Sequence, residues 1–491
     1  MIKKLIFSVI FCNLVLTNSS LDYYLHIYSA NRLSNGSMID IPFRLADIDF
    51  IHDKDSFSFQ SSLSLEHNPE YSNLYVQNSS SYDLFSFDID LRELYVKWYF
   101  DNFELSVGKQ IHTWGATDQN SPLDNASPFD YYYIFSYGTE QKMGSFSTAL
   151  NFYRENTSYG FVFSPIHHTN RLPLGEDDFP IDLPVKPRPE LISDVENKIE
   201  FGGYLKHSFD NGDIGLSYYK GNDRVFNLSG INIFNNQLET LDSPGIDTVL
   251  SYRSTDVIGL SATIISSPIT IRLDHGYFHT KDMKNDQTIH RDRMDMKNDP
   301  WVGIEANTDF FDTDFDGIND VSVCNSPWYQ ITDQWTFQEE AYYSQTTLQL
   351  EFDIFGATSI LGLFNYNVEK YNAKYLPAIS LPGIEADIDP QEYFYPGLGA
   401  PVAILTSKAL MYSFKRDIGQ SQDVELNLKG LVDLENSGYL TEIGAIFTLS
   451  DNLRFHTYLN KVIGDDTLDD EYRFNQMKDF SHLRFELEYF F

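Results

Sequence analysis

Cysteine and long apolar runs are both scarce in this chain of 491 residues. Of its two cysteines, Cys12 lies in a leader-like N-terminal segment, so Cys324 would stand alone in the mature chain and an intramolecular disulfide is excluded. No segment after the leader is apolar enough to cross a bilayer as a helix. If the protein lies in a membrane, it must therefore cross it with the strands of a closed barrel.

Basic residues and catalytic motifs are also few. Lys and Arg total 35 against 71 Asp and Glu, a formal net charge of −36. This balance argues against nucleic acid as a partner, because phosphate binding needs basic patches. HExxH, GxSxG and phosphate-binding glycine loops are absent, and the adjacent His167 and His168 would point to opposite faces of a strand. We therefore expect no enzyme.

The first 19 residues have the layout of a signal peptide. Lys3 and Lys4 form a basic start, residues 5–16 are mostly apolar, and residues 17–20 are small or polar, as a cleavage site requires. The apolar run is shorter than the roughly 20 residues of a membrane anchor. A lipoprotein site at Cys12 is the remaining alternative. The sequence predicts an exported precursor whose mature part spans residues 20–491.

Aromatic residues are abundant, with 38 Phe and 32 Tyr, and they fall in segments that alternate strictly between apolar and polar positions. The final segment is the clearest: Leu483, Phe485, Leu487, Tyr489 and Phe491 share one face, and His482, Arg484, Glu486 and Glu488 share the other. A packed core would not accept the charged face, whereas a strand between lipid and a wet lumen would. The terminal Phe491 resembles the signal that marks outer-membrane barrels for insertion.

The same alternation recurs at 199–206, 269–274, 348–353 and 424–429. Near Arg92 the apolar phase shifts: Phe87, Ile89 and Leu91 have one parity, and Leu94, Val96 and Trp98 have the other. A β-bulge at this point would keep both halves facing lipid.

Connections between these segments alternate between tight and long. Turn residues mark the tight ones near 101–102, 210–212, 266–268, 355–356 and 450–452. The long polar ones lie near 115–142, 167–194, 222–253, 282–337 and 370–403. The pattern predicts an all-β fold, a single transmembrane antiparallel β-barrel of about 18 strands, or 16, with short periplasmic turns and long extracellular loops. Residues 21–32 are expected to form its first strand. The Pro-rich stretch 173–189 would form either an external loop or a constriction within the lumen.

Residues 91–130 carry a more specific pattern. It comprises Arg92-Glu93-x-Tyr95, Gly108-Lys109-Gln110, Trp114-Gly115 and a Pro-x-Asp that ends at Asp130. This segment resembles porin-like outer-membrane barrels related to alginate-export channels, which implies a monomeric or trimeric diffusion channel. The excess of acidic residues argues against alginate itself, an anionic polymer.

The alternation also predicts which side chains face the lumen. By parity they are Gln110, His112, Trp114, Arg272, Asp274, Glu351, Glu425, Lys429 and Arg484. On this phase Lys109 falls with Leu105 and Val107 on the lipid side, which requires a local bulge. Opposed charges across a lumen would orient polar solutes, although mutual ion pairing is the alternative reading for each of them.

One loop motif has the spacing of a metal site. Asp312, Asp314, Asp316, Gly317 and Asp320 occupy positions 1, 3, 5, 6 and 9 of a DxDxDG loop, and Ile318 would add its carbonyl oxygen. Because Val323 replaces the bidentate Glu of an EF-hand, the motif resembles thrombospondin-type calcium loops more closely. We expect a Ca²⁺ site here, with a solvated acidic loop as the alternative.

Together these patterns predict a porin-type channel of the cell outer membrane for passive diffusion of small polar solutes, with a preference for cations. Its expected partners are outer-membrane lipid and the barrel-assembly machinery. The protein is expected to be a monomer or a homotrimer. A barrel enzyme such as a lipid hydrolase, and a surface receptor or adhesin, are the alternative functions.

Overall fold

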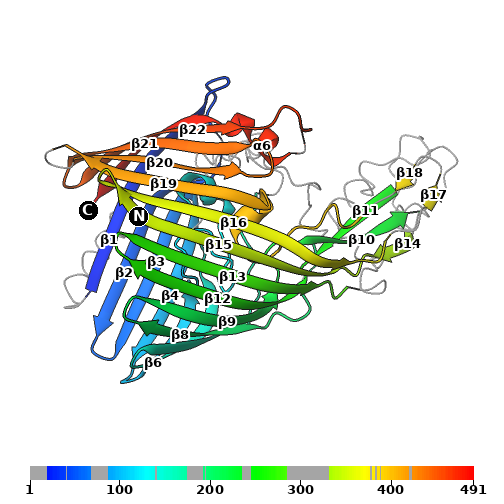
Figure 1. Cartoon of the computed structure of the whole chain (residues 1–491), viewed down its shortest axis with the longest axis horizontal. Coiled ribbons are helices and arrows are strands. Elements are labelled where there is room, and N and C mark those ends of the chain that lie inside the picture. The colour runs from blue at the N-terminus through cyan, green and yellow to red at the C-terminus, as the bar shows by residue number, and fades with distance from the viewer. Residues whose placement is uncertain are drawn as a thin grey trace, which may run out of the picture.

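The computed structural model describes residues 19–39, 41–67, 87–138, 141–173, 192–193, 195–234, 245–284, 331–375, 379–381, 384–386, 389–419, 423–470 and 472–491. Eighteen strands form one closed antiparallel sheet (Figure 1). They are β1 (Ser19–Arg32), β2 (Phe43–Lys54), β3 (Phe57–His67), β4 (Phe87–Tyr99), β5 (Phe103–Gln110), β6 (Ser145–Arg154), β7 (Thr157–Ser164), β8 (Glu200–Phe209), β9 (Gly212–Asn222), β12 (Ser254–Ser266), β13 (Ile269–Lys281), β15 (Glu340–Ile354), β16 (Ala357–Asn372), β19 (Lys408–Ile418), β20 (Val424–Asp433), β21 (Tyr439–Ser450), β22 (Leu453–Ile463) and β23 (His482–Phe490).

Each barrel strand pairs with its neighbours along the chain, and β1 pairs with β23 to close the ring. Short turns collect at the end of the barrel that also holds Ser19 and Phe491, whereas long connections collect at the other end (Figure 1). The prediction of an 18-stranded barrel is confirmed, and strand 21–32 is present as β1. By the rule for such barrels, the turn end faces the periplasm and the loop end faces outward.

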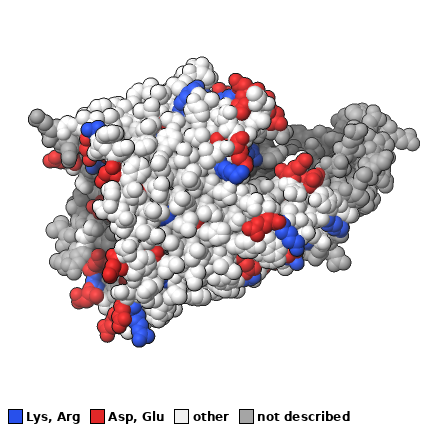
Figure 2. Space-filling view, viewed as in Figure 1, with Lys and Arg blue, Asp and Glu red and all other residues white. Residues whose placement is uncertain are grey.

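The outer wall is an apolar belt. Large apolar side chains project from it, including Ile258 (61% exposed), Leu216 (55%) and Leu449 (59%). Figure 2 shows the middle of one face almost free of charge, with Lys, Arg, Asp and Glu gathered toward its two ends. The opposite parity of each strand turns inward and carries the polar side chains, so the wall separates an apolar outside from a polar inside. Within the described part of the chain, no helix is long and apolar enough to cross a bilayer.

The predicted bulge is present in β4. Ser62 of β3 pairs with Glu93 and Leu63 pairs with Leu91, which leaves Arg92 as the extra residue. Both Ile89 (76% exposed) and Leu94 (40%) consequently project outward. The bulge also explains Lys109 on the neighbouring strand β5, whose ammonium donates a hydrogen bond to the backbone carbonyl of Leu91. The bulge that the position of Lys109 required is therefore in β4, next to Lys109, and not in β5 itself.

Aromatic rings form contacts near the turn end of the barrel. Phe491 stacks on Tyr23 with ring centroids 4.6 Å apart, and Phe100 stacks on Phe103 at 4.3 Å. Aromatic rings commonly lie where lipid head groups meet hydrocarbon. The C-terminal Phe491 thus packs against the first strand at the seam of the barrel.

Some long connections carry structure of their own. Strands β10 (Asn227–Phe234), β11 (Gly245–Ser251) and β14 (Ile331–Thr336) form a three-stranded sheet, and β17 (Ile379–Leu381) pairs with β18 (Ile384–Ala386). These strands form an arm that projects beyond the loop end of the barrel (Figure 1). The connections predicted near 222–253, 282–337 and 370–403 are therefore partly β-structure rather than irregular loop.

Short helices lie at the loop end and pack toward the barrel interior. They are α3 (Tyr131–Tyr137), η4 (Pro401–Ile404), α6 (Arg473–Gln476) and η5 (Lys478–Phe480). Val402, Phe474 and Met477 pack with Ile39 and with Met411 of β19 in one buried apolar cluster. Loops from different parts of the chain therefore share a core inside the mouth of the barrel.

Candidate functional site: the barrel lumen

Residues 111–138 and 141–144, here called the inward loop, lie between β5 and β6 and fold back into the barrel. Asp274 on β13 holds the tip of this loop and is fully buried. Its carboxylate accepts the backbone N–H groups of Ala116 and Thr117 at 2.9 Å each, and the hydroxyls of Thr117 and Ser121 at 2.7 and 2.8 Å. A charged acceptor with four donors fixes the loop against the far wall.

The same tip is bound to β15. The amide of Gln349 accepts the N–H of Asp118 at 3.0 Å and donates to its carboxylate at 2.9 Å. Asp118 also forms an ion pair with Arg272, whose guanidinium lies 3.2 Å from Glu351. The inward loop therefore crosses the lumen from β5 to the β13–β15 wall.

Buried backbone needs internal hydrogen-bond partners, and the inward loop supplies its own. Asp124 accepts the N–H groups of Trp114 and Gly115 at 2.7 and 3.0 Å and forms an ion pair with Lys142 at 2.6 Å. A Cβ on residue 115 would lie 2.0 Å from the hydroxyl oxygen of Ser121, so this close approach requires glycine at position 115. The loop is rich in Asp, Asn and Ser because such side chains satisfy neighbouring backbone groups.

The base of the inward loop is held by a buried carboxylate among arginines. Asp130 is fully buried and lies 3.7 Å from Arg44 of β2, 3.9 Å from Arg92 of β4 and 3.5 Å from Arg171. Burial raises the pKa of Asp130, and the arginines oppose that rise. Arg92 reaches this cluster because the bulge in β4 inserts it as an extra residue.

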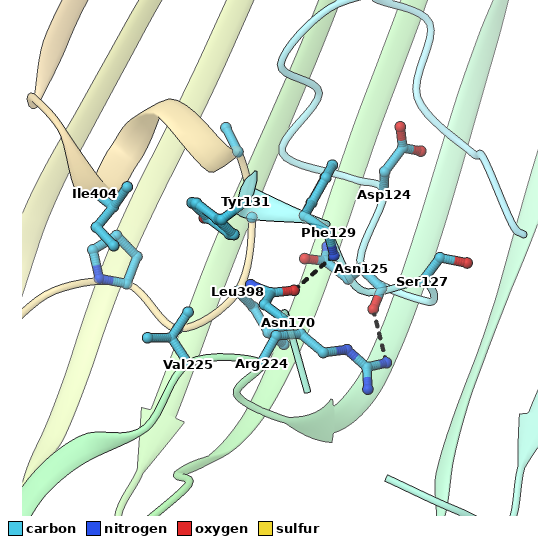
Figure 3. Close-up of a pocket in the computed structure, with 14 residues that line it drawn as sticks. Asp124, Asn125, Ser127, Phe129, Tyr131, Asn170, Arg224, Val225, Leu398 and Ile404 are labelled. Carbon is cyan, nitrogen blue, oxygen red and sulfur yellow. Dashed lines mark hydrogen bonds between the residues drawn. The ribbon is translucent and has the colours of Figure 1, made fainter. Parts of the chain in front are cut away.

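A seam between four connections lies beside this cluster (Figure 3). The N–H of Phe129 donates to the side-chain oxygen of Asn170 at 2.8 Å, and Arg224 donates to the carbonyl of Asn125 at 3.1 Å. Residues 396–400 and Ile404 complete the lining. The space enclosed is about 10 Å³, close to the volume needed for one water molecule, so this seam is packed and takes no solute.

Further buried ion pairs fix the loops to the wall. Glu200 lies 2.8 Å from Arg224 and 2.7 Å from His167, whereas His168 accepts the N–H of Phe146 at 3.1 Å. The two adjacent histidines therefore have separate partners. In a second group, Arg253 lies 2.7 Å from Asp223 and 2.6 Å from Glu339. These ion pairs attach the long connections to the barrel wall at its loop end.

An open space remains between the inward loop and the β19–β23 wall. This space, here called the luminal cavity, has a volume of about 410 Å³. Gln119, Ile134 and Gly138 of the inward loop border it on one side. Cavities of this volume fall within the range of small-molecule sites.

The luminal cavity is apolar toward the loop end and charged toward the turn end. Its loop-end lining consists of Val402, Leu405, Met411, Leu431, Leu440, Phe474 and Met477. Further along the same strands Lys415 pairs with Glu425 at 2.7 Å, and Lys429 pairs with Glu442 at 3.2 Å. Arg484 lies 3.4 Å from the same Glu442. Lys415 is 58% exposed, so its charge is accessible from the lumen.

The nine side chains predicted for the lumen fall into three groups. Glu425, Lys429 and Arg484 line the luminal cavity. Arg272, Asp274 and Glu351 lie on the inner face of β13 and β15, where Arg272 and Asp274 contact the inward loop. Gln110 is the last residue of β5, His112 and Trp114 lie at the start of the inward loop, and the ring centroids of Trp114 and Tyr219 are 6.3 Å apart. Their part in a solute path remains a prediction.

A serine–histidine pair joins the start of the inward loop to β6. The hydroxyl of Ser147 lies 2.8 Å from Nε2 of His112, and both side chains are buried. Across the part of the chain that the structure describes, no recorded contact joins Nδ1 of His112 to a carboxylate.

Sequence alternation missed the groups that attach the loops. Asp118, Asp124 and Asp130 lie outside any strand, so parity says nothing about them. The available signal was composition: residues 117–130 combine Asp, Asn, Ser and Pro without an alternating pattern, as a self-satisfied buried loop requires.

The predicted calcium loop, with ligands Asp312, Asp314, Asp316, Ile318 and Asp320, lies outside the described residues, as do the signal peptide and most of the Pro-rich stretch 173–189. Among the described residues, no group of three or more His, Cys, Asp or Glu side chains is placed to hold a metal ion. The Ca²⁺ site stays a prediction.

A closed sheet with an apolar outer wall and a charged interior defines a β-barrel of the outer membrane, because only a closed barrel leaves no unpaired strand edge in lipid. No protein-family model matches the chain, and no curated protein is similar to it in sequence.

Solved structures with a similar barrel include OccK8 (OprE) of Pseudomonas aeruginosa, with 9% identity, 97% of this chain and 98% of that chain covered, and a TM-score of 0.42. OpdK of Pseudomonas aeruginosa, solved with vanillate, has 8% identity over 97% and 99%, with a TM-score of 0.43. Wzi of Escherichia coli, described as a carbohydrate-binding β-barrel involved in capsule assembly, has 8% identity over 99% and 87%, with a TM-score of 0.43. Similarity at this level identifies neither a family nor a solute.

Proposed function

We propose that this protein is a passive outer-membrane channel for small hydrophilic solutes. The observation that supports the proposal is the luminal cavity of about 410 Å³ inside a closed barrel, with charged side chains along its wall. A structural core would exclude Lys415 and Glu425, whereas a solute path needs side chains that replace water around a polar solute. A porin-like barrel of the alginate-export type remains the proposed relationship, on the strength of residues 91–130.

The proposed path runs along the β19–β23 wall, since the inward loop occupies the side of β13 and β15. The apolar loop-end lining narrows entry, and the charged lining beyond it accepts polar groups. Lys415, Lys429 and Arg484 are matched by acids, so the cavity itself carries little net charge. The proposed preference for cations therefore arises mainly at the mouth, from the net charge of −36.

Conductance in planar bilayers tests the proposal. Ser413 lines the luminal cavity, and its neighbour Phe414 on β19 has the opposite parity and faces lipid. We expect stable conductance steps from the native protein, a clear decrease with Ser413→Trp and no change with Phe414→Trp. Equal conductance of the two variants would place the path elsewhere.

A silent native protein would reject the channel. Release of fatty acid from phospholipid vesicles by the same preparation would then favour the barrel-enzyme alternative. A reversal potential that favours anions in a KCl gradient would reject only the cation preference. Crosslinking in the membrane distinguishes a monomer from a homotrimer.

The arm favours a second candidate, a surface receptor or adhesin. Its sheet combines strands from two connections, and the indole of Trp335 on β14 donates to the carbonyl of Lys374 at 3.0 Å. A channel has no evident need for such a projection. Replacing residues 229–250 with a short turn should leave conductance unchanged, and loss of cell-surface binding in that variant would support the second role.

A further inference from the structure

The lining of the luminal cavity changes from apolar to charged along three neighbouring strands, β19, β20 and β21. On each strand the inward side chain nearer the loop end is apolar, and one nearer the turn end is charged. The apolar members are Met411, Leu431 and Leu440, and the charged members are Lys415, Lys429 and Glu442. Leu431 and Lys429 are two positions apart, which is about 7 Å along a strand. The cavity therefore has an apolar and a charged compartment within the length of one small molecule.

The long connections complete the apolar compartment. Val402 of η4, Leu405 directly after η4 and Phe474 of α6 all line the cavity. Val402 and Phe474 are buried in the apolar cluster at the mouth of the barrel, and Leu405 packs against that cluster. Such a lining gains free energy when an aliphatic side chain displaces water from it. It offers little to a solute that is polar throughout.

The charged compartment presents both signs of charge to the lumen. The ammonium of Lys415, which is 58% exposed, lies 2.7 Å from the carboxylate of Glu425, which is 23% exposed. Lys429 is 34% exposed and lies 3.2 Å from Glu442. Glu442 is fully buried and also lies 3.4 Å from Arg484, so its charge stays compensated within the wall. A solute that enters this compartment therefore meets an accessible acid as well as accessible lysines.

We propose that the luminal cavity selects zwitterions with an aliphatic side chain, the chemical class of an apolar α-amino acid. The inference rests on the proposed channel and names its preferred solutes. The carboxylate of the solute would contact Lys415, its ammonium would contact Glu425, and its side chain would lie in the apolar compartment.

The pairing of the wall charges favours a zwitterion over a solute of one charge. An anion would gain Lys415 but would face the like charge of Glu425, and a cation would face Lys415 in the same way. A zwitterion supplies a partner to each member of the Lys415–Glu425 pair, so neither wall charge loses its compensation. Equal numbers of accessible acids and bases would weaken the binding of simple ions, but they suit a solute that carries both charges.

Block of the KCl current by added solutes tests this in planar bilayers. The probes are L-leucine, 4-methylpentanoate, which is leucine without its amine, 3-methylbutylamine, which is leucine without its carboxylate, and glycine, which lacks the side chain. We expect leucine to half-block the current at a concentration about fivefold lower than either single-charge analogue, because it forms one additional ion pair. The half-blocking concentration of glycine should be about tenfold higher than that of leucine.

The probe series separates this inference from the proposed function. A native protein without conductance rejects the channel itself. A conducting protein that leucine and 4-methylpentanoate block equally, or that leucine and 3-methylbutylamine block equally, remains a channel but overturns the zwitterion assignment. Equal block by leucine and glycine overturns the role of the apolar compartment.

Two variants of the charged wall locate the head-group contacts. Lys415→Gln with Glu425→Gln removes one accessible charge of each sign and should raise the half-blocking concentration of leucine about fivefold. The matched control is Lys206→Gln with Asp213→Asn, a pair at 3.2 Å between β8 and β9 with similar exposures of 43% and 18%. This pair does not line the luminal cavity, so its loss should leave the block by leucine unchanged.

A second variant tests the apolar compartment outside the barrel strands. Leu405→Asn should raise the half-blocking concentration of leucine and leave that of glycine unaltered, whereas a general distortion of the cavity would change both. Leu434→Asn is the control, because Leu434 is 51% exposed and lies outside the cavity lining. Heat-dependent electrophoretic mobility verifies that each variant is folded. Unchanged block by leucine in folded Lys415→Gln, Glu425→Gln protein, or in folded Leu405→Asn protein, overturns the corresponding contact.

Discussion

Removing the carboxylate of Asp274 should release the tip of the inward loop. This side chain is fully buried and accepts four hydrogen bonds from Ala116, Thr117 and Ser121 at 2.7 to 2.9 Å. The substitution Asp274→Ala removes all four at once. It leaves the strand pairing of β13 intact, because the backbone hydrogen bonds of β13 do not involve the side chain.

The free energy with which Asp274 holds the loop tip is the difference between two opposing contributions. Each hydrogen bond to a charged acceptor contributes about 1.5–3 kcal/mol, so four contribute about 6 kcal/mol or more. Holding an ionised carboxylate away from water costs several kcal/mol, which offsets about half of that gain. The net loss is about 3 kcal/mol, equivalent to a change of about 100-fold in the ratio of docked to released loop tip. Asp118 and Asp130 still attach the rest of the loop.

Single-channel recording in planar bilayers measures the effect. We expect Asp274→Ala to give larger or more frequent conductance steps, because the released tip no longer crosses the lumen. Asp353→Ala is the matched control, since Asp353 lies exposed beside the turn between β15 and β16. Traces from Asp274→Ala that match those of the native barrel, in protein shown to be folded, would refute the role of this carboxylate as the anchor.

Four further changes to the chain or its conditions have defined outcomes. Gly108 has φ +137° and a Cβ there would lie 2.2 Å from the carbonyl oxygen of Leu94, so Gly108→Val should lower the yield of heat-modifiable folded barrel, measured against native protein by electrophoresis. Deleting Arg92 should abolish assembly by turning half of β4 to the wrong face, whereas Arg92→Ala should still assemble. Lys429→Gln should shift the reversal potential toward cations, because Glu442 keeps its negative charge, and an unchanged potential would place the path away from the luminal cavity. Limited proteolysis should cut the segment 312–320 faster in the presence of a chelator, and equal cutting would contradict the Ca²⁺ prediction.

The barrel could be predicted because its determinants are local. Parity along one strand decides which side chains face lipid, so residues 482–491 and even the slip at Arg92 were readable without any structure. Turn-forming residues marked the short connections, and the regular alternation of short and long connections predicted the number of strands.

The interior of the lumen could not be predicted in the same way. Asp274 and Ala116 are 158 positions apart, and no local pattern links them. Parity placed Asp274 inside the barrel, but whether it faces water or a folded loop depends on the inward loop. Likewise, the pairing of Lys429 with Glu442 follows from the register of β20 with β21 and not from either residue alone.

The pairing of β1 with β23 constrains the order in which the barrel assembles. Tyr24 lies opposite Phe490. Strand β1 therefore cannot pair with β23 until residues 482–490 have been synthesised and exported. During that interval β1 has a free edge, which in water invites aggregation. Ring closure is therefore a late step in biogenesis, and shortening the chain by its last ten residues should leave a sheet that no bilayer can accept.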